Sequence, residues 1–315
     1  MIDNPDGGHN TVLLAEAVAA LKPEPGGCFI DCTFGRGGHS SAIFERLGET
    51  GKLLAMDKDA AAVNSAQARS LSKSDRFQVV HSSFTGLKAE AERLGWDGGV
   101  SGILMDLGVS SPQLDEAQRG FSFMRSGPLD MRMNTAEGPT AAQWLADVTE
   151  GDLIQVLHEY GEERHARQIA KALITRRAHQ PLVMTSDLAR LIEETVPTRE
   201  KGKHPATRTF QAIRIYLNRE LDELGEALKQ ARDVLKPGGR LVVIAFHSLE
   251  DRIVKRFMRD EERGCTADEV KAHVQIRRNP VLRRVGRAVK PSLDEIRVNS
   301  RARSAVMRVA EKLGA

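Results

Sequence analysis

Apolar runs and amphipathic segments alternate along the first third of the chain. Four short apolar runs predict buried strands at Cys28–Thr33, Lys52–Met56, Phe77–Val80 and Gly102–Asp106. Apolar residues at three- and four-residue spacing predict helices between them, near residues 40–48, 59–69 and 85–94. This alternation is typical of a parallel sheet with helices on both of its faces.

A helix is also expected ahead of the first strand. Asn10 or Thr11 can cap it, Leu14, Val18 and Leu21 share one of its faces, and Pro23 ends it. The residues before it are expected to form a flexible lead-in.

The alternation stops after residue 113. Residues 119–134 are irregular, and helical patterns follow near 140–158, 162–178 and 185–196, with no strand pattern among them. We interpret this stretch as a helical insertion. Its irregular first part mixes apolar and cationic residues, which suits either stacking on RNA bases or packing of a long loop onto the core, and both interpretations remain open.

The sheet pattern returns near the C-terminus. One long helix is predicted from Phe210 through Leu228, because its apolar residues keep a single core-facing stripe until Lys236-Pro-Gly-Gly239. A fifth strand is expected at 240–246, and Ser304–Ala310 resembles a closing edge strand. We therefore predict a discontinuous α/β domain, residues 1–118 and 209–315, interrupted by a helical domain, residues 119–208.

The connection after the first predicted strand contains three glycines within four residues. Gly35, Gly37 and Gly38 follow the strand-end acid Asp31, and a helix pattern begins immediately afterwards. Glycines let the backbone turn sharply and approach a ligand closely. A strand, glycine loop and helix in this order indicate a nucleotide-type cofactor on the first βα turn.

The acids beside this loop bear on which cofactor it is. The loop lacks the third glycine of a dinucleotide fingerprint, since Ser40 occupies that position. Asp31 would repel a pyrophosphate but attract the ammonium and sulfonium groups of S-adenosylmethionine. Asp57 ends the second strand, where an acid can hold both ribose hydroxyls. The combination favours S-adenosylmethionine.

Two further strand ends carry polar residues. Asp106 ends the fourth strand and is followed by the turn Val109–Pro112, which places both where chemistry would occur in an open α/β sheet. His247 and Ser248 follow the fifth strand, and Ser248 is expected to cap the next helix.

Composition sets the protein class. The 315 residues are 41% hydrophobic and 28% charged, which is ordinary for a globular protein of one or two domains. The apolar runs are shorter than a membrane span, and the N-terminus lacks a basic-then-apolar signal. We expect a cytoplasmic protein without a membrane partner, and a monomer and a homodimer both remain open.

The three cysteines indicate neither a disulfide framework nor a metal site. Cys28 and Cys32 are expected on one buried face of their strand, with no histidine pair to complete four zinc ligands. We therefore expect core thiols and no metal.

Charge is distributed unevenly. Residues 236–315 carry 19 Lys and Arg against 10 Asp and Glu, a net charge of +9, whereas the preceding residues carry 27 against 33, a net charge of −6. A basic C-terminal segment fits a nucleic-acid partner, and it also fits a solvated surface. Its arginine-rich part contains Arg277, Arg278, Arg283, Arg284 and Arg287.

Several long motifs together resemble the bacterial MraW (RsmH) family, the S-adenosylmethionine-dependent cytosine-N4 methyltransferases of 16S ribosomal RNA. The resemblance spans nearly the whole chain and rests on Thr11-Val-Leu-Leu-x-Glu16, Asp31-x-Thr-Phe-Gly-Arg-Gly-Gly-His39, Asp106-Leu-Gly-Val-Ser-Ser-Pro-Gln-Leu-Asp115, Arg119-Gly-Phe-Ser-Phe-Met124, Pro128-Leu-Asp-Met-Arg132, His204-Pro-Ala-Thr-Arg-Thr-Phe-Gln211 and Phe246-His-Ser-Leu-Glu-Asp251.

The resemblance implies a class I, Rossmann-like methyltransferase sheet with an inserted all-helical recognition domain. It implies methylation of the exocyclic N4 amine of a cytidine in the decoding centre, the P-site region of the small ribosomal subunit. Asp106 is the candidate catalytic residue. The cofactor contacts implied at matching positions are Gly37, Gly38, His39, Asp57, Phe84, Asp106 and Gln113.

Other activities are weighed against this one. Methylation at cytosine C5 would need a cysteine near the fourth strand, and none of the three cysteines is expected there. A small-molecule or protein methyltransferase would not need the basic C-terminal segment. A non-catalytic ribosome-assembly factor that keeps the cofactor fold is the remaining alternative.

Overall fold

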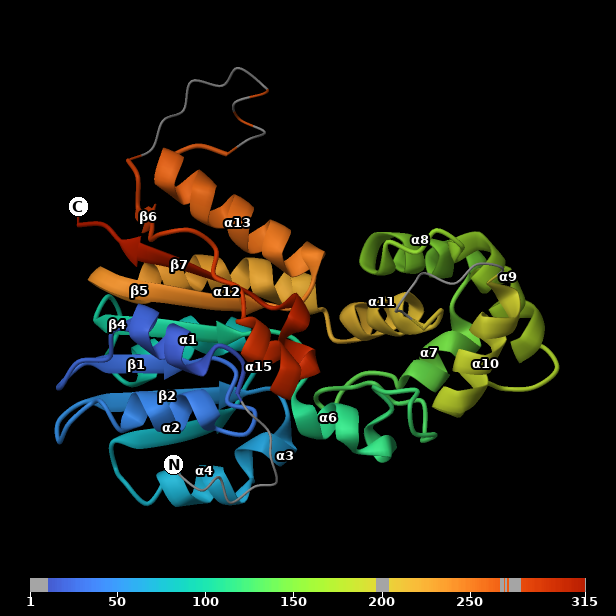
Figure 1. Cartoon of the computed structure of the whole chain (residues 1–315), viewed down its shortest axis with the longest axis horizontal. Coiled ribbons are helices and arrows are strands. Elements are labelled where there is room, and N and C mark those ends of the chain that lie inside the picture. The colour runs from blue at the N-terminus through green and yellow to red at the C-terminus, as the bar shows by residue number, and fades with distance from the viewer. Residues whose placement is uncertain (1–10, 197–203, 267–268, 270, 272–278, 315) are drawn as a thin grey trace. The chain divides into compact units, whose positions relative to one another are not determined.

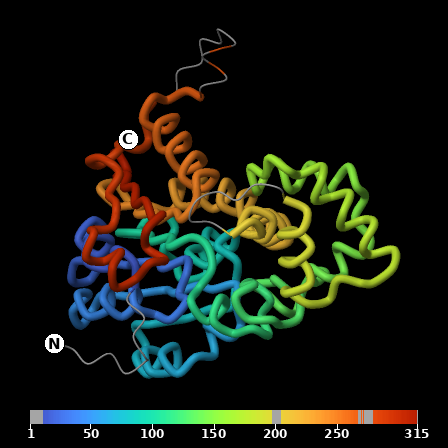
Figure 2. The backbone as a smooth tube through the Cα atoms, turned by 45° about the vertical axis from the view of Figure 1, so that its right-hand side comes forward, coloured from blue at the N-terminus to red at the C-terminus, as the bar shows by residue number. Residues whose placement is uncertain are grey.

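The computed structural model describes residues 11–196, 204–266, 269, 271 and 279–314 (Figure 1). The chain divides into two compact units. The sheet unit consists of Met1–Gly108 and Leu221–Ala315, and the helical unit of Val109–Glu220. In Figure 2 the blue-to-teal and the orange-to-red parts of the backbone belong to the sheet unit, and the green-to-yellow part to the helical unit.

These boundaries differ from the predicted residues 118 and 209. Side chains on both flanks of the predicted insertion pack into the core of the helical unit: Val109 and Leu114 on one side, and Phe210 and Ile213 on the other. The flanking segments therefore belong to the inserted unit, which is larger than the loss of strand patterning alone indicates.

The described residues form a seven-stranded sheet in the order β3-β2-β1-β4-β5-β7-β6. The five neighbouring strands β3, β2, β1, β4 and β5 pair in parallel, and β7 is antiparallel to both of its neighbours. Their bounds are β1 Cys28–Asp31, β2 Lys52–Asp57, β3 Phe77–His81, β4 Val100–Asp106, β5 Leu235–Ala245, β6 Leu282–Arg284 and β7 Val306–Lys312.

The prediction of a closing edge strand at the C-terminus was wrong. β7 lies between β5 and β6, and β6 occupies the edge. β6 is a three-residue strand with one buried side chain, Leu282, followed by two exposed arginines. So short and basic a segment carries no alternating apolar pattern, which explains why the sequence did not indicate it.

Helices cover both faces of the sheet, as its alternating side chains require. Ile30 and Cys32 face one core cluster, and Phe29 faces the other. The first face is covered by α5 (Leu87–Arg93), α12 (Glu220–Val234) and α13 (Ser248–Arg263). The second face is covered mainly by α1 (Leu14–Leu21), α2 (Gly38–Phe44) and α4 (Ala66–Leu71) (Figure 1). The other α-helices that the structure describes in this unit are α3 (Ala60–Val63) and α15 (Leu293–Val298).

Thr11 does not cap α1 as predicted. The helix begins at Leu14 after Leu13, whose φ is 52° and whose backbone N–H donates to Glu295 Oε1 at 2.7 Å. A carboxylate 282 residues away thus satisfies this helix end. Asn10, the other predicted cap, and the predicted lead-in lie outside the described residues.

The helical unit packs its helices around an apolar core of its own. Its α-helices are α6 Ser111–Asp115, α7 Ala141–Asp147, α8 Glu150–Gly161, α9 Ala166–Arg177, α10 Thr185–Thr195 and α11 Thr207–Leu217. α7 and α8 replace one predicted helix, because Thr149 caps a new helix by accepting from the Asp152 N–H at 3.1 Å.

The long helix predicted through Leu228 is two helices, α11 and α12. Arg219 between them has φ 52°, which ends the regular helix. The side chain of Asn218 accepts from the Met133 N–H at 2.7 Å and donates to the Met131 carbonyl at 2.8 Å and the Arg214 carbonyl at 2.9 Å. The contacts of Asn218 with this distant loop stabilise the break between α11 and α12. The apolar stripe continues across the break and therefore does not indicate it.

That loop, residues 119–134, is packed onto the core. Phe121, Leu129 and Met131 are buried in the helical unit. Arg132 forms two hydrogen bonds to the Asp130 carboxylate, at 2.8 and 2.9 Å. The structure therefore favours the packing interpretation for these residues over base stacking.

Among the described residues, none of the helices is both long enough and apolar enough to cross a lipid bilayer.

Candidate active site

Three strands of the sheet unit end on an aspartate. β1 ends at Asp31, β2 at Asp57 and β4 at Asp106. Asp31 is in register with Ala55 and Leu104, so it lies two residues deeper in the sheet than the other two aspartates. The order β2-β1-β4 places all three at the edge where open α/β sheets bind ligands, beside the point at which the strand order reverses.

Asp31 is fully buried and bonded within its own loop. Ser40 Oγ donates to it at 2.6 Å, and the Thr33 N–H donates at 3.1 Å. Burial raises the pKa of Asp31, and these hydrogen bonds oppose the rise. Thr33 Oγ1 also accepts from the Asp106 N–H at 2.7 Å, which ties the ends of β1 and β4 together.

The glycine loop is shaped by contacts within the chain. Gly37 has φ 77°, and a Cβ there would lie 2.8 Å from the ring of Phe34. A Cβ on Gly38 would lie 2.0 Å from Thr11 Oγ1. These positions require glycine because the protein's own side chains approach them, and not only because a ligand must.

Asp57 holds the same loop from the second strand. Its Oδ2 accepts from the Gly35 N–H at 2.7 Å, and its Oδ1 accepts from the Asp59 N–H at 2.8 Å. Burial raises the pKa of Asp57 to about 6, with smaller contributions from the charges of Asp59 and Asp31. The group therefore titrates close to neutral pH.

Asp106 and His39 contain polar atoms that no described residue satisfies. His39 Nδ1 lies 3.6 Å from Asp106 Oδ2, while Asp106 Oδ1 and His39 Nε2 are buried without a hydrogen-bond partner. Burial lowers the pKa of His39 to about 4, so the imidazole is neutral at physiological pH. Burial, and then the charges of Asp31 and Glu250, raise the pKa of Asp106 well above its usual range.

Glu250, in the first turn of α13 just after β5, is a second acid whose charge acts on Asp106. Its Oε2 accepts from the Phe246 N–H at 2.8 Å and the His247 N–H at 3.3 Å. The cap of α13 is His247, whose Nδ1 accepts from the Glu250 N–H at 3.4 Å, and not Ser248 as predicted. Ser248 is the first residue of the helix, because the extended backbone at His247 lets the imidazole reach the helix end first.

The remaining predicted site residues lie in separate places. Phe84 opens a short 3-10 helix, Phe84–Gly86, and is half-buried against the core. Gln113 belongs to the helical unit, where its Oε1 accepts from the Ser110 N–H at 2.9 Å as part of a capping box on α6. Ser110 and Gln113 thus have a local structural role, which the Ser-x-x-Gln spacing could have indicated.

Residues 6–313 match the model of the MraW methylase family. The chain belongs to this family. It is 55% identical over 303 residues to a Methylococcus capsulatus protein named ribosomal RNA small subunit methyltransferase H, covering 96% of this chain and 100% of that protein. It is 51% identical over 307 residues to the protein of the same name from Alteromonas mediterranea, covering 97% of each chain.

A solved structure with a more distant likeness is a SAM-dependent O-methyltransferase from Thermotoga maritima. Its sequence is 10% identical, the TM-score is 0.41, and the match covers 96% of this chain and 65% of that one.

The cofactor of this MraW methylase is S-adenosylmethionine, and the site fits it. Burial, and then the charges of Asp31 and Glu250, raise the pKa of Asp106, and a cationic ligand would relieve this crowding of negative charge at the strand ends. The unpartnered Asp106 Oδ1 and His39 Nε2 supply buried polar atoms that a ligand can satisfy.

One expectation about the cysteines was wrong. Cys32 does lie beside the fourth strand, since its backbone N–H donates to the Leu104 carbonyl at 2.9 Å. Cys32 is 1% exposed, and burial, followed by the charge of Asp31, raises the pKa of its thiol well above the usual range. Burial and protonation, and not distance from β4, make it unsuitable as a nucleophile.

The C-terminal arginines are partly engaged within the fold. Arg283 Nη2 lies 2.6 Å from Glu311 Oε1, and Arg284 pairs with Glu262. Arg287 is exposed, whereas Arg277 and Arg278 lie outside the described residues. Acids from β7 and α13 thus neutralise two of the cations that were candidates for RNA binding.

Proposed function

We propose that this MraW methylase methylates small-subunit ribosomal RNA, at the exocyclic N4 amine of a cytidine in the decoding centre. The name of the relatives, ribosomal RNA small subunit methyltransferase H, supports RNA as the substrate class, and the motif resemblance supports the amine as the methylated group. The observation that carries the proposal is the buried, unpartnered Oδ1 of Asp106 at the end of β4, an acceptor without a donor in the part of the chain that is described.

This acceptor suits a cytosine amine. The lone pair of that amine is delocalised into the ring, so it must be turned out of conjugation and aimed at the methyl carbon. A carboxylate oxygen that accepts from an amine hydrogen holds the nitrogen in this orientation. Backbone carbonyls of the Val109–Pro112 turn are the second candidate acceptors.

Asp106 also has the chemistry to take the released proton. S-adenosylmethionine, when bound, supplies an electrophilic methyl group whose departing sulfur keeps the bonding electron pair. As the amine nitrogen gains the methyl group it must lose one proton, and a carboxylate with a raised pKa is a stronger base than an ordinary one. His39 is neutral, so it adds no positive charge that would lower the basicity of Asp106.

The cofactor would be held by residues at the ends of the strands. We assign the loop contacts to Gly37, Gly38 and His39, the ribose hydroxyls to Asp57, and the adenine to Phe84. Asp106 and Gln113 complete the proposed set. Half-burial of Phe84 leaves part of its ring available for such a contact.

Cofactor affinity should depend on pH through Asp57. Its pKa of about 6 means that it is ionised and accepts two ribose donors above that pH, but is protonated below it. We expect the Kd for S-adenosylmethionine to be constant above about pH 6.5 and to rise by up to about tenfold per unit below pH 6. Calorimetric titration across this range measures it.

Asp57→Asn is the control, because an amide cannot titrate. Asp57→Asn should bind S-adenosylmethionine more weakly at pH 7.5, and its Kd should no longer rise below pH 6. If the Kd of the variant still rises there as in the wild type, Asp57 is excluded as the cause of the rise. In the ligand-free protein the raised pKa of Asp57 has the opposite effect on the stability of the fold: it favours folding at low pH. Between pH 4 and pH 6 the folded state holds a proton that the unfolded state has lost, so stability from this group falls as pH rises.

Product analysis tests the proposed function directly. Small ribosomal subunits that lack their own base methylation would be incubated with labelled S-adenosylmethionine, and the RNA digested to nucleosides. We expect N4-methylcytidine in decoding-centre RNA. Label at cytosine C5 or in protein would contradict the proposal, and cofactor binding without any transfer would indicate an assembly factor.

A further inference from the structure

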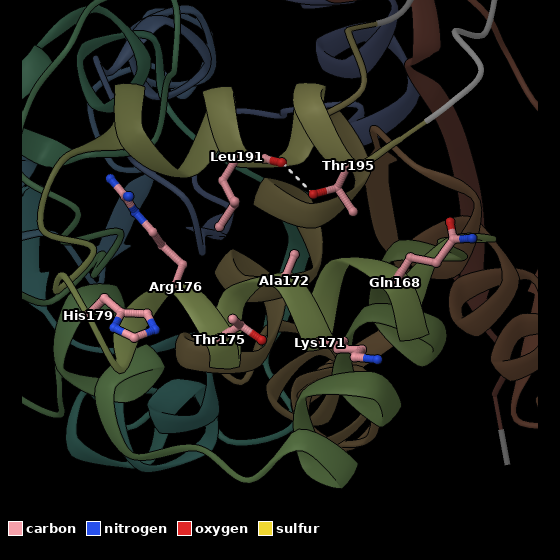
Figure 3. Close-up of a pocket in the computed structure, with 8 residues that line it drawn as sticks. All are labelled: Gln168, Lys171, Ala172, Thr175, Arg176, His179, Leu191 and Thr195. Atoms are coloured by element: carbon pink, nitrogen blue, oxygen red, sulfur yellow. Dashed lines mark hydrogen bonds between the residues drawn. The ribbon is translucent and has the colours of Figure 1, made fainter.

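The helical unit contains an open pocket of about 700 Å³ between α9 and α10 (Figure 3). No residue of the proposed active site belongs to it. Its lining residues come from α9 and the turn after it on one side, and from α10 on the other: Gln168, Lys171, Ala172, Thr175, Arg176, His179, Leu191 and Thr195.

The two walls differ in charge. The α9 side contributes Lys171 and Arg176, with His179 just beyond the helix end, whereas α10 contributes Leu191 and Thr195, which are uncharged. α9 itself contains Arg167, Lys171, Arg176 and Arg177 and no acidic residue. The pocket therefore has a positively charged wall facing a neutral one.

The basic side chains that line the pocket are not paired within the described part of the fold. Lys171, Arg176 and His179 are exposed and form no side-chain hydrogen bond or ion pair within the described ranges. Two neighbouring arginines behave differently. Arg177 donates to the Leu145 and Val148 carbonyls, each at 2.7 Å, and Arg190 pairs with Asp187 at 2.7 Å.

The arrangement suits an extended anion. At 1.5 Å rise per residue, Lys171 and Arg176 lie about 7.5 Å apart along the axis of α9, and His179 lies just beyond the helix end. Two cations at this separation match successive phosphates of a chain better than they match one small anion. Ala172 and Leu191 offer apolar contact, and the hydroxyl of Thr175 and the amide of Gln168 offer hydrogen bonds, which suit ribose.

We infer that this pocket binds the ribose–phosphate backbone of the substrate RNA, away from the base that is methylated. The inference rests on the proposed function, since it takes ribosomal RNA as the substrate. It assigns to the helical unit a contact that positions the RNA without reading its bases.

Salt dependence of RNA binding tests the inference. The probe is a fluorescein-labelled fragment of decoding-centre RNA, and its Kd is measured by anisotropy between 50 and 300 mM KCl. The variants are Lys171→Gln, Arg176→Gln and their double. Arg167→Gln is the matched control, because it removes an exposed cation of the same helix that does not line the pocket.

Each phosphate contact contributes about 0.7 to 0.9 to the slope of log K against log salt. We expect the double variant to lose about 1.4 to 1.8 of slope and to bind at least tenfold more weakly at 100 mM KCl, with each single variant losing about half of that slope. Arg167→Gln should change the slope by less than 0.3, and circular dichroism should show all four proteins folded.

A wild-type slope in the double variant, or an equal loss in Arg167→Gln, would overturn the inference. Unchanged RNA binding with reduced methylation of assembled subunits would assign the pocket to a protein partner instead, and would equally overturn it. Failure of the proposed function is a separate result: the wild-type protein would then methylate no RNA, whatever the salt slopes show.

Discussion

Asp106→Asn is expected to abolish most methyl transfer while leaving the protein folded. The amide keeps the size of the side chain but loses the charge that attracts the amine hydrogens and accepts the proton. We expect the rate of methyl transfer at saturating cofactor to fall by about 100- to 1,000-fold. Single-turnover incorporation of labelled methyl groups into small subunits measures it.

The unfolding temperature of the variant shows whether the loss of methyl transfer comes from lost chemistry or from unfolding of the protein. Burial, Asp31 and Glu250 all disfavour a charge at position 106, so Asp106→Asn should have an unfolding temperature equal to or above that of the wild type. Asp97→Asn, at an exposed position, is the matched control and should leave both properties unchanged. A variant at position 106 that retains transfer within about fivefold would exclude Asp106 from the chemistry.

Asn218→Ala is expected to have the largest effect on the stability of the helical unit. Asn218 is 4% exposed, and its amide makes three hydrogen bonds to the backbone carbonyls and N–H of Met131, Met133 and Arg214. Alanine would remove these partners from the Met131 carbonyl and the Met133 N–H, whereas the Arg214 carbonyl would still accept from the backbone N–H of residue 218 at 3.1 Å. We expect the free energy of unfolding to fall by about 3 to 5 kcal/mol.

The two tryptophans allow this to be measured in one unit. Trp144 lies in the helical unit and Trp96 in the sheet unit, so Trp96→Phe leaves a single reporter on the helical unit. Urea unfolding of Asn218→Ala would be followed by fluorescence in that background. Asn64→Ala removes an exposed amide that bonds the Ala60 carbonyl, and should cost less than about 1 kcal/mol. Equal losses in the two variants would contradict the role given to Asn218.

The strand ends show how far local sequence reaches. The apolar runs that end on Asp31, Asp57 and Asp106 were recognisable because a buried strand followed by a polar turn is a local pattern. The glycine loop was recognisable for the same reason, although the close approach of Thr11 to Gly38 was not. That contact joins separate elements, and no local pattern reports it.

Helix ends show where local sequence fails. The stripe through α11 and α12 has correct helical spacing on both sides of Asn218, so it predicts one helix. The break depends on hydrogen bonds to residues 131–133, far along the chain. Leu13 and Glu295 give a second case, in which a distant carboxylate replaces the expected local cap.

By itself, the sequence determined the five parallel strands, the aspartates that end three of them and the family to which the chain belongs, because each depends on residues adjacent in the chain. The tertiary structure alone decided the place of β7 inside the sheet and the larger extent of the helical unit. It also decided which cations are free: Arg284 is neutralised by Glu262, whereas Lys171 and Arg176 face a pocket. Burial of side chains decides the extent of the helical unit, and the approach of opposite charges decides which cations are neutralised. Both depend on residues that only folding brings together.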